Sequence, residues 1–222
     1  MDAHMTPASP QSLQAGDPAP AFVLQSVQTD GTVSLSDYRG ESPLFLALFR
    51  GLYCPFCRRA IAHMAESADH LKPLGFKSLG VVATELENAR LYYRYRPTRL
   101  PLAVDPSLST HRSYGMPKVT PTPEMLEQMQ AVRVDAAGEL PRPMSIEEAS
   151  RALDKLDGFQ ATDVDRRDHD RQFPQLEGQF LIDRDGIIRW MNFEGSRDGF
   201  AGLGKFPSFQ ELLAAAHLAA SA

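Results

Sequence analysis

Short apolar runs and segments with helical spacing alternate along the chain. Leu44–Phe49 is continuously apolar and Phe76–Ala83 has an apolar centre, so each predicts a strand buried on both faces of a sheet. Between them, apolar side chains at positions 56, 61, 64 and 65 have helical spacing and predict a helix from Pro55 to about Leu71. A strand, a helix and a second strand in this order are typical of an α/β fold with parallel strands.

Shorter patterns surround this unit. Thr29-Asp30-Gly31 predicts the turn of an N-terminal hairpin, and Asp185-Gly186 predicts the turn of a hairpin near the C-terminus. The other predicted elements are strands at 21–25, 32–35, 100–104, 179–182 and 187–191, helices at 85–95 and 207–219, and a helix or turn at 106–114.

The segment 116–175 interrupts this order. It is rich in proline, and both Thr122-Pro123 and the capping box at Ser145–Glu148 predict the start of a helix. The mixed charges at 163–171 predict a solvated face. We therefore expect one domain over 16–222 with a helical insertion at 116–175, largely at the surface, after a flexible tail at 1–15.

Composition removes several classes of function. The chain has 222 residues, 43% of them hydrophobic, with a net charge of −5, which gives no reason to expect nucleic acid or an anionic membrane as a partner. The polar segment Met1–Gly16 has no apolar run of signal-peptide length, and no stretch is long enough to span a bilayer. We expect a cytoplasmic location.

The two cysteines, Cys54 and Cys57, carry the candidate chemistry. A disulfide across so short a loop restrains little chain entropy, so a dithiol that opens and closes is the better explanation. A zinc site needs two more ligands, and neither His63 nor His70 is well placed to supply one. We expect no metal, and no cofactor beyond the redox-active disulfide itself.

The position of the pair before a helix favours one thiolate. If Cys54 is the N-cap, Pro55 takes the first helical position, and the N–H of residue 57 points back at the Cys54 sulfur. Free N–H groups and the helix dipole then favour the Cys54 thiolate, while Cys57 suits the resolving role. Three arginines, namely Arg50, Arg58 and Arg59, add positive charge nearby if they face the site.

Four other features give weaker signals. Tyr53 is a candidate to pack beside the disulfide of a partner. We expect His111 at the surface rather than in an acid–base role, and Trp190 in the core. Gly202-Leu203-Gly204 lacks a preceding strand and does not predict a phosphate loop.

Four segments resemble signatures of the peroxiredoxin and alkyl-hydroperoxide-reductase-like families, the AhpC/TSA redoxins. They are Gly16-Asp17-Pro18-Ala19-Pro20-Ala21-Phe22, Asp105 through Tyr114-Gly115, the hairpin from Phe180 to Arg189, and Gly204-Lys205-Phe206-Pro207-Ser208. The resemblance implies a thioredoxin fold, with a central mixed sheet flanked by helices, an N-terminal β-hairpin and the redox cysteine at a helix N-terminus. It leaves 116–175 unaccounted for.

The chain also departs from the family pattern. When the peroxidase signature Pro-x-x-x-Thr-x-x-Cys is aligned on Cys57 as the peroxidatic cysteine, Cys54 replaces the threonine and Arg50 replaces the proline. Glu177 stands where the family has its active-site arginine.

Tyr-Cys-Pro-Phe-Cys is instead similar to the thioredoxin and glutaredoxin patterns, in which the first cysteine attacks. The cis-proline of those families has no counterpart in Leu176-Glu177-Gly178, although Pro174 is near.

Three functions remain open. In the leading hypothesis, a thiol–disulfide oxidoreductase, Cys54 attacks a disulfide and Cys57 resolves the mixed disulfide. In a thiol-dependent peroxidase, Cys57 becomes a sulfenate with which Cys54 condenses. The third is a non-catalytic sensor or binding module that uses 116–175 as its surface. The expected partners are a disulfide-bearing protein or a peroxide, and a reductant such as a thioredoxin or glutathione system; a homodimer is left open.

Overall fold

The structure is a computed structural model that describes residues 13–116, 122–135 and 138–220. The predicted tail therefore lies outside the described residues up to position 12, whereas Leu13 packs against the core and the Gln14 N–H donates to Asp17. Within the described residues, no helix is both long and apolar enough to cross a membrane.

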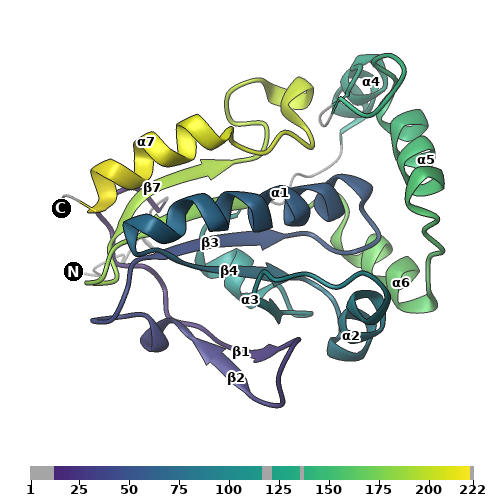
Figure 1. Ribbon diagram of the computed structural model, residues 1–222. Helices are drawn as coiled ribbons and strands as arrows, with labels where there is room; N and C mark the ends of the chain where they lie inside the picture. Colours follow the sequence, from purple (N-terminus) through teal and green to yellow (C-terminus); the bar gives the residue numbers. More distant parts are fainter. Residues whose placement is uncertain (1–12, 117–121, 136–137, 221–222) are drawn as a thin grey trace, which may run out of the picture.

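A mixed sheet forms the centre of the molecule (Figure 1). Its strands among the described residues are β1 (Val23–Ser26), β2 (Thr32–Ser34), β3 (Leu44–Phe49), β4 (Lys77–Val82), β5 (Leu102–Val104), β6 (Gly178–Ile182) and β7 (Ile188–Phe193). They are ordered β2-β1-β5-β4-β3-β6-β7. β3, β4 and β5 run parallel, and every other neighbouring pair is antiparallel. The predicted thioredoxin fold is confirmed.

Helices pack around this sheet, and α1 and α7 lie side by side over one face of it (Figure 1). The helices are α1 (Pro55–Leu71), α2 (Leu86–Tyr95), α3 (Ser109–Ser113), α4 (Pro123–Ala131), α5 (Ile146–Asp157), α6 (Asp163–Gln172) and α7 (Phe209–Ala220). Short 3₁₀ segments occur at Leu35–Asp37, Lys72–Leu74 and Gly199–Gly202.

The central strand β3 is buried on both faces, as its apolar run predicts. Phe45, Ala47 and Phe49 pack into the cluster that contains α1 and α7. Leu44, Leu46 and Leu48 pack into a second cluster on the opposite face, with Tyr114 and Phe180. Burying each large apolar side chain contributes about 1.5–3 kcal/mol, so this strand fixes the position of the loop that follows it.

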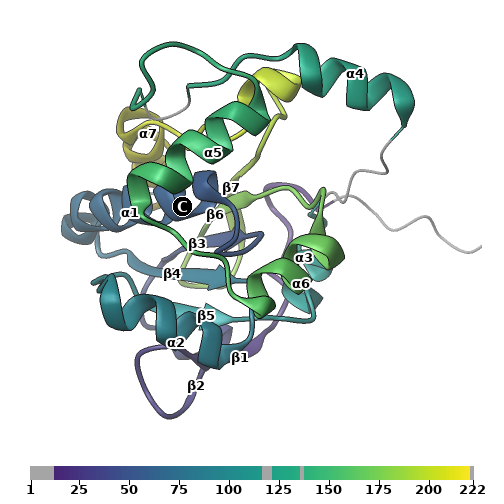
Figure 2. The same cartoon turned by 90° about the vertical axis from the view of Figure 1, so that its right-hand side faces the viewer.

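The insertion at 116–175 packs part of its helical surface into the core. Its helices α4, α5 and α6 stand at the end of the molecule where α1 begins (Figures 1 and 2). Ala149 and Leu153 of α5 are buried in the same hydrophobic cluster as the cysteines. The other residues of α5 are exposed or half-buried, so this helix lies at the surface and buries one face.

The mixed-charge run is also not simply a solvated face. Asp165 and Asp168 of α6 are each 3% exposed. The Thr84 hydroxyl donates to Asp168 at 2.6 Å, and Asn88 Nδ2 donates to Asp165 at 2.9 Å. Buried carboxylates are tolerated when such donors satisfy them, and these bonds fix α6 against α2 and against Thr84, which precedes α2.

Candidate active site

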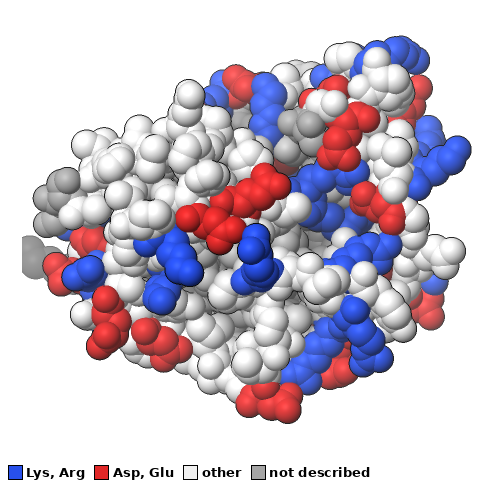
Figure 3. Space-filling model, viewed as in Figure 1, with Lys and Arg blue, Asp and Glu red and all other residues white. Residues whose placement is uncertain are grey.

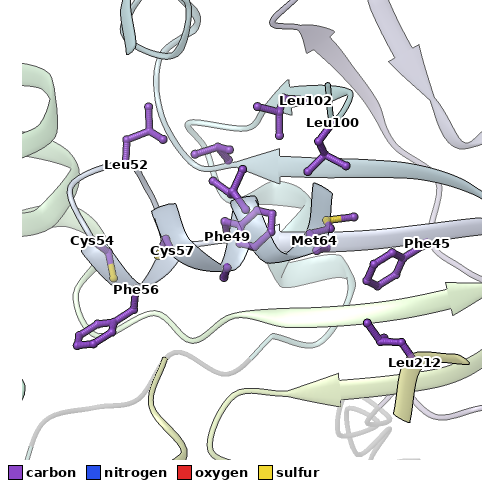
Figure 4. Close-up of a cluster of buried hydrophobic side chains, with 14 of the residues drawn as sticks. Phe45, Phe49, Leu52, Cys54, Phe56, Cys57, Met64, Leu100, Leu102 and Leu212 are labelled. Carbon is purple, nitrogen blue, oxygen red and sulfur yellow. The ribbon is translucent and has the colours of Figure 1, made fainter. Parts of the chain in front are cut away.

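The two cysteines lie where β3 ends and α1 begins. Cys54 is the N-cap of α1, Pro55 is the first helical residue, and Cys57 lies on the first turn (Figure 4). This confirms the predicted local geometry. Gly51 is needed in the preceding loop, because a Cβ there would lie 2.7 Å from Cε1 of Tyr53.

The two thiols are free and differ in access to solvent. Cys54 keeps 7% of its surface exposed, whereas Cys57 is fully buried at 0%. Both belong to the hydrophobic cluster under α1. A reagent from solution therefore meets the Cys54 thiol first, whereas the Cys57 thiol has no direct contact with solvent.

The environment of Cys54 favours its thiolate. Burial by itself raises the pKa of this thiol, but the Cys57 thiol, the Arg50 guanidinium and the backbone N–H of Cys57 outweigh burial and lower the pKa to about 6. The backbone N–H acts through its partial charge, since it does not make a regular capping hydrogen bond to Sγ. Cys54 is thus largely thiolate at neutral pH.

Cys57 has the opposite environment. Burial, the hydrogen bond to Cys54 and the negative charges of Cys54 and Glu177 raise the pKa of Cys57 well above its ordinary value. The Sγ atoms of Cys54 and Cys57 and one carboxylate oxygen of Glu177 all lie within 4.8 Å of one another. Glu177 itself is buried, and burial together with Glu194 and Cys54 raises its pKa to about 8.

Arg50 joins the dithiol to two buried carboxylates. Its Nε lies 3.6 Å from Glu177 Oε1, and its Nη2 donates to Glu194 Oε2. Glu194 also accepts the backbone N–H of Gly204 at 2.7 Å, which fixes the carboxylate in place. Sequence reasoning missed Glu194, although a carboxylate directly after an apolar strand was a signal that could have found it.

Arg58 does not face the sulfurs, and the prediction that it adds charge there is wrong. Its side chain donates to Asp154 at 2.6 Å, to Asp157 at 2.9 Å and to the Leu52 carbonyl at 2.8 Å. The guanidinium also lies 4.0 Å above the centre of the Phe159 ring. Arg58 therefore ties the C-terminal end of α5 to the start of α1.

Arg59 is likewise held by acids of the insertion. It pairs with Glu139 at 2.7 Å and with Asp157 at 3.0 Å. Acidic and basic side chains are interspersed over the face seen in Figure 3. The positive charge of Arg59 is therefore neutralised by Glu139 and Asp157 and does not act mainly on the thiols.

Replacing Arg58 by methionine is expected to lower the free energy of unfolding by about 2–4 kcal/mol, because two carboxylates and a buried carbonyl lose their common donor. Partial solvent access of Asp154 and Asp157 keeps the loss below that of a fully buried pair. Urea unfolding measures it, with R166M as control, since Arg166 pairs with Asp163 at an exposed site and should lose less than about 1 kcal/mol. Equal losses of unfolding free energy in the two variants would contradict the role of Arg58 in holding α5 against the start of α1.

The chain is similar in sequence and structure to known proteins. The sequence model described as the AhpC/TSA family matches residues 15–191, more than half of the chain. The chain belongs to the AhpC/TSA family. This membership confirms the resemblance inferred from the sequence motifs.

Several relatives of this AhpC/TSA protein are named for thiol chemistry. The thiol-disulfide oxidoreductase ResA of Halalkalibacterium halodurans is 30% identical over 127 residues, which cover 56% of this chain and 70% of that protein. The structure of a putative thiol:disulfide interchange protein DsbE from Chlorobium tepidum is 22% identical, covers 95% of this chain and 100% of that chain, and has a TM-score of 0.53. Peroxidoxin BcpB from Mycobacterium tuberculosis is 15% identical, covers 91% and 97%, and has a TM-score of 0.54. The two structures share the fold.

Within this AhpC/TSA frame, Tyr53 directly precedes Cys54, and Pro174 lines a small cavity together with Arg50 and Phe56. The peptide bond between Phe173 and Pro174 is cis, so the proline that lies near Leu176-Glu177-Gly178 in the sequence is itself a cis-proline. The Tyr53 ring packs edge-on against His169 at 5.3 Å, and His169 stacks on Phe173 at 5.5 Å. The Tyr53 hydroxyl is buried and has no hydrogen-bond partner among the described residues, and burial raises its pKa well above the ordinary tyrosine value.

The structure contradicts the expectation for His111 and agrees with the expectation for Trp190. His111 is fully buried, not at the surface, and burial lowers its pKa to about 4, so the ring is neutral. Trp190 packs against the core as expected.

Cys54, Cys57 and Glu177 together offer three ligands of the kind that zinc prefers, one more than the sequence suggested. Arg50 lies against the same atoms and competes with a cation for them. The set therefore favours thiol chemistry over metal binding.

Proposed function

We propose that this protein is a thiol–disulfide oxidoreductase in which Cys54 is the nucleophile and Cys57 the resolving thiol. One observation carries the proposal: the site lowers the pKa of Cys54 to about 6 and raises that of Cys57. An attacking thiol needs to be ionised at neutral pH, whereas a resolving thiol is best kept protonated until the mixed disulfide has formed. The similarity to ResA supports the same activity.

The first step uses the Cys54 thiolate. It attacks one sulfur of the substrate disulfide, forms a new S–S bond to that sulfur and expels the other as a thiolate, which takes a proton from water. Arg50 holds the thiolate in place before the attack and neutralises charge as the bond is exchanged.

The second step needs the proton of Cys57 to leave. Glu177 lies beside the Cys57 thiol. The negative charge of Cys54 is one of the causes that raise the pKa of Glu177. Once Cys54 has become part of the mixed disulfide, that charge is gone, so Glu177 releases its own proton to water and, as a carboxylate, accepts the Cys57 proton. Cys57 then attacks Cys54 Sγ, the second substrate thiolate leaves, and two electrons have passed from the dithiol to the substrate.

The peroxidase hypothesis is not favoured by this geometry. It requires Cys57 as a reactive thiolate, yet Cys57 is fully buried and its pKa is raised by its surroundings. The position of the family's arginine is occupied by Glu177, a carboxylate that disfavours a second negative charge.

The proposed substrate is a disulfide-bearing protein, and an external thiol reductant reopens the disulfide between Cys54 and Cys57. No bound cofactor is required by these steps. The cytoplasmic location, the homodimer and the sensor role stay predictions.

Thiolate titration of single-cysteine variants tests the assignment. In C57S the serine hydroxyl still offers a donor to Cys54, so Cys54 should titrate near pH 6 by ultraviolet absorbance and by the rate of alkylation. In C54S the remaining Cys57 should titrate above the ordinary thiol value of about 8.5. A lower midpoint for Cys57 than for Cys54 would reverse the roles and favour the peroxidase.

Replacing Glu177 by glutamine is expected to slow turnover by roughly 10²-fold, the scale of a lost general base, and to let the mixed disulfide accumulate. The rate of Cys54 alkylation should change little, because the first step does not use this carboxyl. E124Q is the matched control, since Glu124 is exposed on α4. Unchanged kcat in E177Q would contradict the proton-acceptor role.

The same E177Q variant has a stability signature. The folded pKa of Glu177 is raised, so its ionisation opposes folding as pH rises from its unfolded value of about 4.3 toward about 8. The variant should therefore gain stability relative to the native chain between pH 5 and pH 9 in urea unfolding. A loss that grows with pH over this range would contradict the raised pKa.

A further inference from the structure

The insertion builds a groove that ends close to the dithiol. α4, α5 and α6 enclose a groove of about 530 Å³, and a smaller cavity of about 50 Å³ lies between this groove and the start of α1. Met129, Ile146 and Phe173 line both spaces, so the two meet along these side chains. Figure 2 shows the three helices gathered at this end of the molecule.

The inner end of this passage belongs to the active site. Phe56, which stands between the two cysteines in the sequence, lines the small cavity together with Arg50 and Glu194. The Phe56 ring points away from the core residue Phe49 (Figure 4), and Gly204 packs against it so closely that a Cβ would lie 2.7 Å from the ring. A group in the cavity is therefore within reach of the residues that surround the thiolate.

The walls of the passage are mainly apolar. Leu126 and Phe173 keep 42% and 40% of their surface exposed, which is unusual for large apolar side chains without a partner. Met125 and Met129 add flexible side chains that adapt to differently shaped groups. The passage is thus suited to apolar side chains rather than to a single rigid ligand.

Charge decides between the disulfides that could enter. Among the described residues that line the outer groove, Glu147 is the one carboxylate and none is lysine or arginine. Glutathione disulfide is anionic and would meet no cation in the outer groove, and Arg50 of the inner cavity is already paired with Glu194. A neutral or apolar polypeptide segment meets no such penalty, and a groove of this volume lies in the range of ligand sites.

We propose that this passage selects polypeptide disulfides in which a large apolar residue flanks the reactive cysteine. The inference rests on the proposed oxidoreductase function and adds its substrate class. The flanking side chain enters between Met129 and Phe173 while the substrate sulfur meets Cys54. Contacts with one such side chain are typically worth roughly 10–100-fold in kcat/KM.

Three substrates separate this inference from the function on which it rests. Two are matched peptides whose single cysteine carries the same small thiol as a mixed disulfide, with leucine in one and aspartate in the other beside the cysteine. The third is bis(2-hydroxyethyl) disulfide, which has no flanking side chain. The native chain should reduce all three and prefer the leucine peptide to the aspartate peptide by roughly 10–100-fold.

Groove variants then locate the preference. L126E places a carboxylate in the wall of the outer groove and should lose most of the preference while reducing the small disulfide as the native chain does, and M129E should lose the preference as well. L156E is the matched control, since Leu156 is on α5, 62% exposed and outside the groove lining, and it should keep the preference. Leu126 is exposed, so L126E is expected to fold even if M129E does not.

Each outcome has one meaning. Equal rates for the two peptides with the native chain, or faster reduction of glutathione disulfide than of the leucine peptide, overturn the inference. Equal loss on the small disulfide in L126E would show that the groove acts on the dithiol and not on specificity, which also overturns it. Failure of the native chain to reduce even the small disulfide counts against the proposed function itself.

Discussion

Replacing Cys57 by serine is expected to stop the reaction at a covalent complex between Cys54 and its substrate. The Cys54 thiolate is still formed, because Arg50 and the first turn of α1 remain in place. Serine cannot attack the mixed disulfide, so the second step has no nucleophile. Mass spectrometry of C57S mixed with a disulfide peptide should show one substrate thiol bound per chain, and thiol reductants should release it.

Replacing Cys54 by serine should remove turnover altogether. Loss of the nucleophile is expected to lower disulfide reduction by at least ~10³-fold, since Cys57 is buried and protonated at neutral pH. The double variant C54S/C57S gives the background rate. Full activity of C54S, or a trapped adduct on Cys57 instead of Cys54, would show that the roles are assigned to the wrong sulfurs.

Replacing Arg50 by methionine is expected to change both reactivity and stability. The pKa of Cys54 should rise from about 6 toward the ordinary thiol value of about 8.5, because the guanidinium is one of the main groups that lower it. At pH 7 the thiolate would then fall from about nine-tenths to a few per cent, and alkylation of Cys54 would slow by roughly 30-fold. The dithiol would also become more reducing, because its reduced form loses the stabilised thiolate.

The stability effect of R50M comes from the two carboxylates left behind. The Glu194 and Glu177 side chains are 3% and 4% exposed, and each loses its cationic partner. Breaking a buried ion pair from one side costs about 3–5 kcal/mol, which urea unfolding resolves. R94M is the control, since Arg94 is exposed, and its effect should stay within about 0.5 kcal/mol. If R50M leaves both the Cys54 titration and the stability unchanged, Arg50 does not organise the site.

The strand and helix that carry the cysteines were predictable because their signals are local. The apolar run ends at Phe49 and the proline at position 55 begins the helix, and the structure places both boundaries at the predicted residues. Propensity, capping and periodicity within a short segment are sufficient there, since the packing agrees with them.

The predictions that failed concerned side chains paired with distant parts of the chain. Arg58 was expected at the sulfurs, but Asp154 and Asp157 of the insertion bind it. The run that contains Asp165 and Asp168 was expected to be a solvated face. Both carboxylates are instead buried and accept hydrogen bonds from Thr84 and Asn88. A charge pattern along the sequence cannot reveal such partners, because the hydrogen bonds that make burial favourable come from another element.

The sequence by itself determined that two cysteines stand at the start of a helix in an AhpC/TSA frame, with a proline that leaves the first of them as the N-cap. That position already favours the Cys54 thiolate, and only the tertiary structure supplies the charged groups around it. Arg50 and Glu194 are 144 positions apart, and they meet beside Glu177 because the ends of β3, β6 and β7 lie together in the sheet. The pKa of a buried thiol depends on the charges within a few ångströms of it, and the fold, not the local sequence, sets those charges.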